Sequence, residues 1–259
     1  MDIAYTVAGF SVGAIVGLTG VGGGSLMTPL LVLLFGIHPS VAVGTDLLYA
    51  AITKAGGTLA HGMKGTVDWA ITRRLALGSI PAAALTLLVL GQLAPGGIGG
   101  ATGLIKVALG VALLLTAVAI IFRKQIQAFA LRHSDGRENP RRTATLTVVT
   151  GAVLGVLVSI SSVGAGALGV SALFFLYPRL PTLRIIGSDI AHAVPLTLVA
   201  GIGHWFLGSV DWSLLGSLLI GSLPGIWLGS HVSTRVPDRV LRPILAGMLV
   251  LVGSKLIAA

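Results

Sequence analysis

The sequence predicts an all-α polytopic membrane protein, built from two inverted-topology repeats of five hydrophobic segments each. First, its 259 residues are 54% hydrophobic and only 10% charged, whereas soluble domains carry about 25% charged residues. Second, its apolar runs last 17 to 23 residues, which suits helices crossing about 30 Å of hydrocarbon. Third, uncommon residues recur in one register in the two halves. These features exclude a soluble enzyme, a disordered chain and a membrane β-barrel, whose strands alternate over roughly ten residues.

Ten segments follow from the apolar runs, in the same order of lengths in each half. We expect them at 3–19, 25–36, 41–61, 70–92 and 102–122, and then at 144–162, 167–177, 185–206, 213–231 and 239–258. The predicted organisation is a first transmembrane repeat at 1–122, a basic cytoplasmic linker at 123–143 and a second transmembrane repeat at 144–259.

The repeat is indicated by residues that seldom match by chance between apolar helices. At an offset of 143, Gly44 and Asp46 correspond to Gly187 and Asp189. The same offset relates a longer set, in which His61, Asp68, Trp69 and Pro81 correspond to His204, Asp211, Trp212 and Pro224. Histidine, aspartate, tryptophan and proline in one register predict a duplication.

The basic residues predict that the two repeats lie in opposite orientations. The 123–143 stretch is rich in arginine, which places it in the cytoplasm. The loop near Arg73 is basic, whereas its counterpart at 207–212 has no base. In the next pair of loops the bias reverses: 91–101 has no base, whereas its counterpart, the region of Arg235, is basic. With inverted repeats, fourteen of the seventeen bases face the cytoplasm and both termini lie outside. The expected location is the inner cell membrane, as a multi-pass protein.

Each half opens with a long segment, a glycine-rich break and a segment of about 12 residues. Twelve helical residues span about 18 Å, too little to cross comfortably. A broken or re-entrant helix pair is therefore expected, with its tip at membrane depth beside protein or water. Free backbone N–H groups at such a helix start suit a small anion. The expected substrate-binding residues are Gly22, Gly23, Gly24, Ser25, Ser162, Gly164 and Gly166; the alternative is that these glycines only permit tight helix packing.

Four ionisable residues inside the predicted segments are candidates for the site. Intramembrane carboxylates are costly, so Asp46 and Asp189 are candidates for carrying a coupling proton; the alternative is helix capping. Lys54 is a candidate substrate-binding cation, although its long stem also permits snorkelling. His192 follows Asp189 by three residues on one helical face, which makes the pair a candidate proton site. For Asp68 and Asp211 we favour N-capping over function.

The duplicated motifs resemble the sulfite exporter TauE/SafE family, also called the toluene-sulfonate uptake permeases. The resemblance rests on Gly20-Val21-Gly22-Gly23-Gly24 followed by Pro29, then His38-Pro39 and Val43-Gly44-Thr45, with a diverged second copy. It implies an inner-membrane carrier of sulfite, sulfonates or related sulfur-containing anions. The chain departs from the pattern in Ala165 and Ala167 at the second tip, which lacks a proline matching Pro29. It also departs in Asp46 and Asp189, where serine is expected.

The predicted function is secondary transport of small sulfur-containing anions, with the substrate held at the midplane between the two glycine-rich breaks. The alternative is a proton- or ion-coupled carrier of a cation or metal that uses intramembrane Asp and His. An enzyme is not expected, because Ser188, Asp189 and His192 lie within five residues of one helix. We expect no cofactor and no resident metal; the partners are a small anionic substrate and the lipid bilayer, not nucleic acid. The sequence leaves a homo-oligomer open.

Overall fold

The computed structural model describes residues 2–19, 24–93, 102–132, 139–232 and 238–258, and within them the secondary structure is helical. The described helices are α1 (Ile3–Thr19), α2 (Gly24–Leu33), α3 (Pro39–Met63), α4 (Trp69–Leu93), α5 (Thr102–Arg132), α6 (Pro140–Ser161), α7 (Ala167–Leu176), α8 (Thr182–Phe206), α9 (Trp212–Val232) and α10 (Asp238–Ala258). This confirms the all-α prediction, and each described helix coincides with one predicted segment to within a few residues, except at the end of α5.

The main difference from the predicted segments lies in the 123–143 stretch. Helix α5 continues to Arg132, ten residues beyond the predicted end of its segment. Residues 123–132 carry no proline or glycine, so nothing in the sequence stops the helix there. At the other side of the stretch, Pro140 is the first residue of α6 and the Asn139 side chain accepts from the amides of Arg141 and Arg142. Much of the expected linker is therefore helical.

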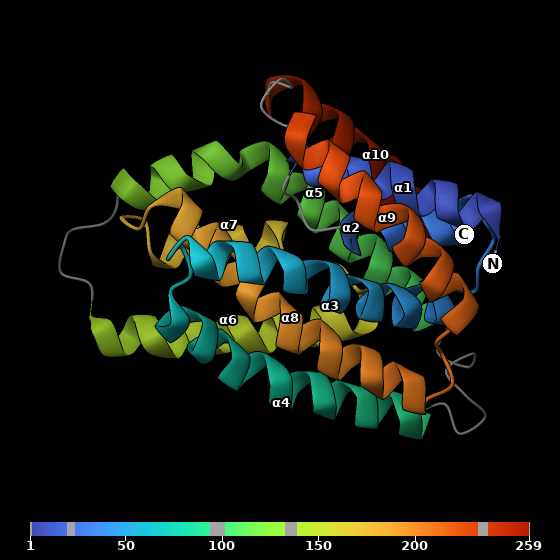
Figure 1. The fold of residues 1–259 in the computed structure, drawn as a ribbon. Helices are drawn as coiled ribbons and strands as arrows, with labels where there is room; N and C mark the ends of the chain where they lie inside the picture. Colours follow the sequence, from blue (N-terminus) through green and yellow to red (C-terminus); the bar gives the residue numbers. More distant parts are fainter. Residues whose placement is uncertain (1, 20–23, 94–101, 133–138, 233–237, 259) are drawn as a thin grey trace.

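Helices α3 and α8 cross in contact with each other at the centre of the bundle (Figure 1). Helix α1 packs along α9, α4 packs along α6, and α5 packs against α10. In Figure 1, α4, α6 and α8 begin at the left end of the bundle, whereas α1, α3 and α9 begin at the right end, where the last helix also finishes.

Glycines allow the α1–α9 and α4–α6 pairs to approach with backbone against backbone. A Cβ atom at Gly13 would lie 2.5 Å from the carbonyl oxygen of Ser222 on α9. A Cβ atom at Gly155 would collide in the same way with the backbone of Ser79 on α4. Small residues at such interfaces are typical of helices packed within a membrane, where van der Waals contact drives association.

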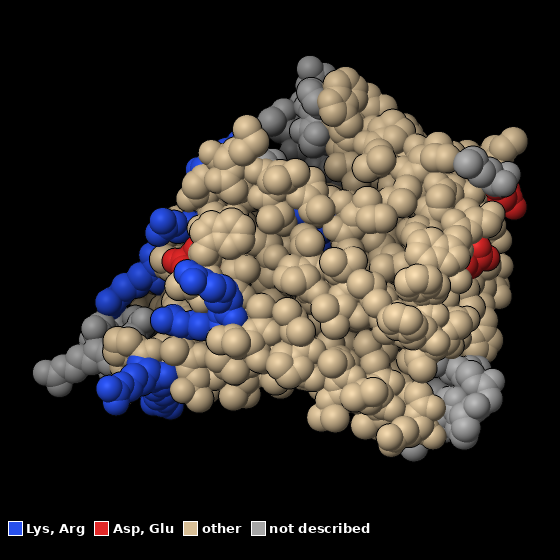
Figure 2. All heavy atoms as spheres, turned by 60° about the horizontal axis from the view of Figure 1, so that its bottom comes forward, with Lys and Arg blue, Asp and Glu red and all other residues tan. Residues whose placement is uncertain are grey.

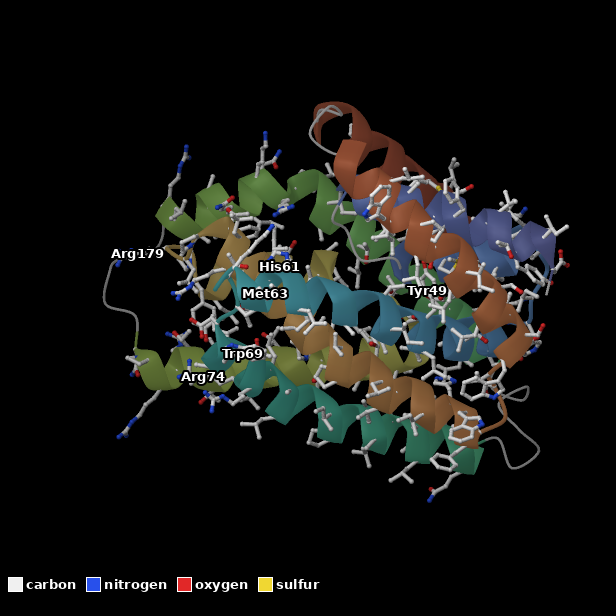
Figure 3. The ribbon with its side chains drawn as sticks, in the orientation of Figure 1. Tyr49, His61, Met63, Trp69, Arg74 and Arg179 are labelled. Atoms are coloured by element: carbon white, nitrogen blue, oxygen red, sulfur yellow. The ribbon has the colours of Figure 1, made fainter. Side chains whose placement is uncertain are left out.

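The outer surface of the bundle is apolar between its two ends. Large side chains such as Leu77, Leu85 and Leu88 on α4 are each more than 60% exposed, and Figure 2 shows uncharged residues covering this face. Lysines and arginines gather at one end (Figure 2), where Figure 3 places Arg74 and Arg179. We call it the basic end. Four of the described helices, α4, α5, α6 and α8, are long and apolar enough to cross a membrane.

Candidate functional site

The crossing of α3 and α8 brings buried ionisable side chains into the middle of the bundle. Asp46 and Asp189 are 0% and 1% exposed, and Lys54 is 9% exposed. His192 is buried as well. Lys54 lies close enough to both carboxyl groups to interact with them electrostatically. Uncompensated buried charges are costly, so a cluster of this kind at membrane depth is a functional candidate.

Asp46 joins three helices through hydroxyl groups. Its Oδ2 atom accepts a hydrogen bond from Thr28 on α2 and another, of 3.0 Å, from Ser162 at the end of α6. The other oxygen of this carboxyl group, Oδ1, is buried without a hydrogen-bond partner in the structure. The two hydroxyl donors stabilise a carboxylate charge and fix α3 against segments from both halves of the chain.

The connection between α6 and α7 is irregular backbone beside Lys54. Ser162 adopts a left-handed conformation with φ 57°, and its amide donates to the carbonyl of Val158 over 2.8 Å. Gly164 and Gly166 have φ values of 122° and 133°, which side-chain-bearing residues rarely adopt. The Lys54 Nζ atom donates to the carbonyl oxygen of Ala165 over 3.0 Å. The ammonium group of α3 therefore holds the α6–α7 connection in place.

Asp189, like Asp46, has one carboxyl oxygen without a partner, but it packs against a different helix. Its Oδ1 atom is buried without a hydrogen-bond partner in the structure. The carboxyl group lies directly against Gly169 on α7, where any Cβ atom would collide with it. Glycine at position 169 is thus what permits this close approach.

His192 lies one helical turn beyond Asp189. Its Nε2 atom is 2.8 Å from the hydroxyl of Ser79 on α4, while Nδ1 is buried without a partner. The Ser159 hydroxyl oxygen on α6 is also unpartnered, although the backbone carbonyl of Ser159 accepts from His204 over 2.8 Å. Buried polar atoms without protein partners are the usual places for ordered water or a bound polar ligand.

The structure describes part of the predicted binding set. Lys54 and Ser162 meet around Asp46 and the α6–α7 connection, which also contains Gly164 and Gly166. Gly22, Gly23 and the side chain of Ser25 lie outside the described residues. Gly24 is the first residue of α2.

The capping interpretation is confirmed for the two aspartates at the starts of α4 and α9. The Asp68 Oδ1 atom accepts from the amides of Ala70 and Ile71, and the Asp211 Oδ1 atom accepts from the amide of Leu214. Within the part of the chain that the structure describes, no three His, Asp or Glu side chains converge as a metal site would require.

Sequence reasoning missed three residues that contact the ionisable cluster. Thr28 donates to Asp46, Gly169 leaves room for Asp189, and Ser79 bonds to His192. Ser79 does have a repeat counterpart in Ser222, which is a usable signal. Thr28 and Gly169 lie inside short apolar helices, where nothing in the local pattern distinguishes them.

The fold and these buried groups define a multi-pass helical membrane protein with a polar centre, the architecture of a transporter. The family model for the sulfite exporter TauE/SafE family matches residues 5–256. The chain therefore belongs to the sulfite exporter TauE/SafE family.

Curated relatives carry transporter names. A protein of Bacillus subtilis (strain 168) named "Probable membrane transporter protein YjnA" is 42% identical over 258 residues, which cover 99% of this chain and 100% of the relative. A second protein of that strain, "Probable membrane transporter protein YdhB", is 28% identical, over 93% of this chain and 97% of its own. A "Probable membrane transporter protein" of Xylella fastidiosa (strain 9a5c) is 26% identical, over 88% and 83%. No solved structure matches this chain significantly. These names indicate a transporter rather than an enzyme.

Proposed function

We propose that this protein is a secondary transporter of small sulfur-containing anions, such as sulfite or a sulfonate. The observation that carries the proposal is the ammonium group of Lys54, buried at the centre of the bundle beside the α6–α7 connection. A cation in this position can exchange its contact with the Ala165 carbonyl for a contact with an anionic oxygen. The hydroxyl of Ser162 lies on the same connection and provides a second donor.

The α6–α7 connection supports the proposed binding position at the midplane. Helix α7 has 10 residues, so it spans only about 15 Å. The residue before it, Gly166, makes no side-chain capping bond. The amides at the start of α7 thus lie near Lys54, and the positive end of the helix dipole favours an anion there. We propose the same role for Gly22, Gly23, Gly24 and Ser25 in the first half.

Equivalent contacts support the proposed inverted repeat. The Asp68 amide donates to the Ser188 hydroxyl over 2.8 Å, and the Asp211 amide donates to the Thr45 hydroxyl over 3.1 Å. Asp68 corresponds to Asp211, and Thr45 to Ser188, at the offset of 143 residues. The repeat therefore relates each of these two hydrogen bonds to the other. The packing of α1 on α9 and of α4 on α6 is exchanged in the same way. Helices α4 and α9 also begin at opposite ends of the bundle (Figure 1), as an axis in the membrane plane requires.

The charge distribution supports an orientation in the inner membrane. Lysines and arginines gather at the basic end, whereas the first and last helices have their outer ends at the opposite side (Figures 1 and 2). The positive-inside rule then places the basic end in the cytoplasm and both termini outside.

Flux measurements on purified protein in proteoliposomes test the function. Wild type is expected to carry labelled sulfite or a sulfonate and to exclude a divalent cation. The Lys54→Gln variant is expected to lose about tenfold to a hundredfold in anion affinity, because a hydrogen bond to a charged group contributes about 1.5–3 kcal/mol. The matched control, Lys64→Gln, changes an exposed lysine at the start of the α3–α4 loop and is expected to behave as wild type. Cation flux without anion flux in wild type would overturn the proposal.

A further inference from the structure

Positions related by the 143-residue offset surround the two buried carboxyl groups with different chemistry. Asp46 and Asp189 are equivalent in sequence, but the residue three positions later is Tyr49 in one case and His192 in the other. The His192 ring bonds to Ser79, and Tyr49 lies beside Ser222, the counterpart of Ser79. The helices are thus repeated, whereas the ionisable side chains at equivalent positions, Tyr49 and His192, differ.

Asp46 has two hydroxyl donors on one carboxyl oxygen, while its Oδ1 atom is buried without a partner, as in Asp189. Two hydroxyls, those of Thr28 and Ser162, donate to the same carboxylate oxygen. These donors come from α2 and from the end of α6, so the carboxylate connects both halves of the chain. Its neighbour Tyr49 does not ionise near neutral pH, since tyrosine loses its proton only at about pH 10.

Asp189 has the surroundings of a group that gains and loses a proton. It is 1% exposed, and no hydroxyl or amide in the described part of the chain donates to its Oδ1 atom. His192, one turn further along α8, has an unpartnered Nδ1 atom, and an imidazole ring can take up a proton at one nitrogen and release one from the other. Asp189 and His192 therefore offer two proton acceptors on one face of α8.

The groups that face this pair come from α3, α4 and α7. Helix α3 contributes Lys54, which also interacts with Asp46, α4 contributes the Ser79 hydroxyl, and α7 contributes Gly169, which does not titrate. Two carboxylates and one ammonium group leave a surplus of one negative charge. A single proton makes the cluster neutral, which removes most of the cost of burying it. Because Asp46 is stabilised as an anion by its two hydroxyl donors, that proton belongs on Asp189.

We infer that Asp189 binds the coupling proton, that His192 relays it, and that Asp46 stays ionised as a structural acceptor. This inference rests on the proposed anion transport. An anion that binds Lys54 brings one negative charge into the cluster, and a proton that crosses with it keeps the buried charge unchanged. The anion and the proton then leave together on the other side of the membrane.

Infrared difference spectroscopy on the purified protein in lipid tests the inference without knowledge of the substrate. The chain has only eight acidic residues, and surface carboxyl groups stay ionised between about pH 8 and pH 5. Wild type is expected to show a protonated-carboxyl band that grows over this range. The band is expected to vanish in Asp189→Asn and to persist in Asp46→Asn and in the control Asp68→Asn, at a half-buried helix cap. A band that persists in Asp189→Asn, or no band in wild type, overturns the inference.

A second variant covers the case in which Asp46→Asn fails to fold. Thr28→Val combined with Ser162→Ala keeps Asp46 but removes both of its hydroxyl donors. A second protonated-carboxyl band is then expected, because Asp46 loses the groups that stabilise its charge. Absence of that second band contradicts the role assigned to Asp46.

Flux assays separate failure of this inference from failure of the proposed function. In wild type, a gradient of one pH unit is expected to drive about tenfold anion accumulation, if one proton crosses with each anion. Asp189→Asn is expected to keep anion exchange at equal pH but to abolish accumulation. His192→Gln is expected to slow accumulation, whereas the repeat-matched control Tyr49→Phe leaves it unchanged. Absence of wild-type sulfite and sulfonate flux counts against the proposed function alone, while accumulation retained in Asp189→Asn counts against the inference alone.

Discussion

The close approach of α1 and α9 predicts a large effect from one added methyl group. In Gly13→Ala, the new Cβ atom would lie 2.5 Å from the Ser222 carbonyl oxygen and 2.8 Å from its Cα, whereas ordinary contact begins at 3.4 Å. The obstacle is backbone, so no side chain can rotate away and the helices must separate by about 1 Å. Overpacking of this kind costs about 1–3 kcal/mol. At about 2–4 °C per kcal/mol, we expect thermal unfolding in detergent several degrees below that of the control.

The control is Gly216→Ala, on α9 itself, where no atom lies within 4 Å of the added Cβ. Alanine there gains up to about 1 kcal/mol of helix propensity and is expected to be neutral or stabilising. The repeat predicts that Gly155→Ala, at the α4–α6 interface, repeats the loss seen for Gly13→Ala. Equal melting temperatures for Gly13→Ala and Gly216→Ala would refute the reasoning, because the added methyl group collides with backbone at Gly13 and meets open space at Gly216.

Three further predictions use the same chain. Single cysteines are readily read out because the chain has none of its own; at Lys64 they should label only from the cytoplasm, and at Gly208 only from outside. Asp68→Asn should be nearly silent in thermal stability, while Asp68→Ala should lose about 1 kcal/mol, because only alanine removes the cap of α4. Gly23→Val should insert and fold yet lose sulfite affinity by calorimetric titration, because a β-branched residue blocks the proposed approach of the anion; unchanged affinity would place the site elsewhere.

The helices could be predicted from the sequence because long apolar runs have one outcome in a membrane. Backbone groups in lipid must bond within their own segment, so each run becomes a helix that ends where polar residues or glycine begin. The limits of α4 and α9 are set by Asp68 and Asp211, which are recognisable caps. The end of α5 was not predictable from hydropathy, since Arg123, Lys124 and Gln125 after Phe122 are polar yet are good helix formers.

The ionisable residues could be named from the sequence, but their unequal surroundings could not. Asp46 and Asp189 carry the same signal, an acid near the start of a membrane segment. They differ in the residue three positions later, Tyr49 or His192, and in partners far along the chain: Ser162 is 116 residues from Asp46. Gly169 matters because Asp189 lies against it, and that contact depends on how α7 packs on α8. Such contacts depend on tertiary structure, so hydrophobic periodicity does not predict them.

The pairing of α1 with α9 also constrains how the protein is made. Helix α1 leaves the ribosome well before the helix along which it packs, because α9 begins only at Trp212. Until α9 has been made, the glycine face around Gly13 lacks its packing partner and contacts lipid or the insertion machinery. In a chain truncated before α9, α1 therefore stays in the membrane without its partner helix. Quality-control proteases that recognise unpacked helices should degrade such chains. The packing of α1 on α9 therefore follows the synthesis of α9.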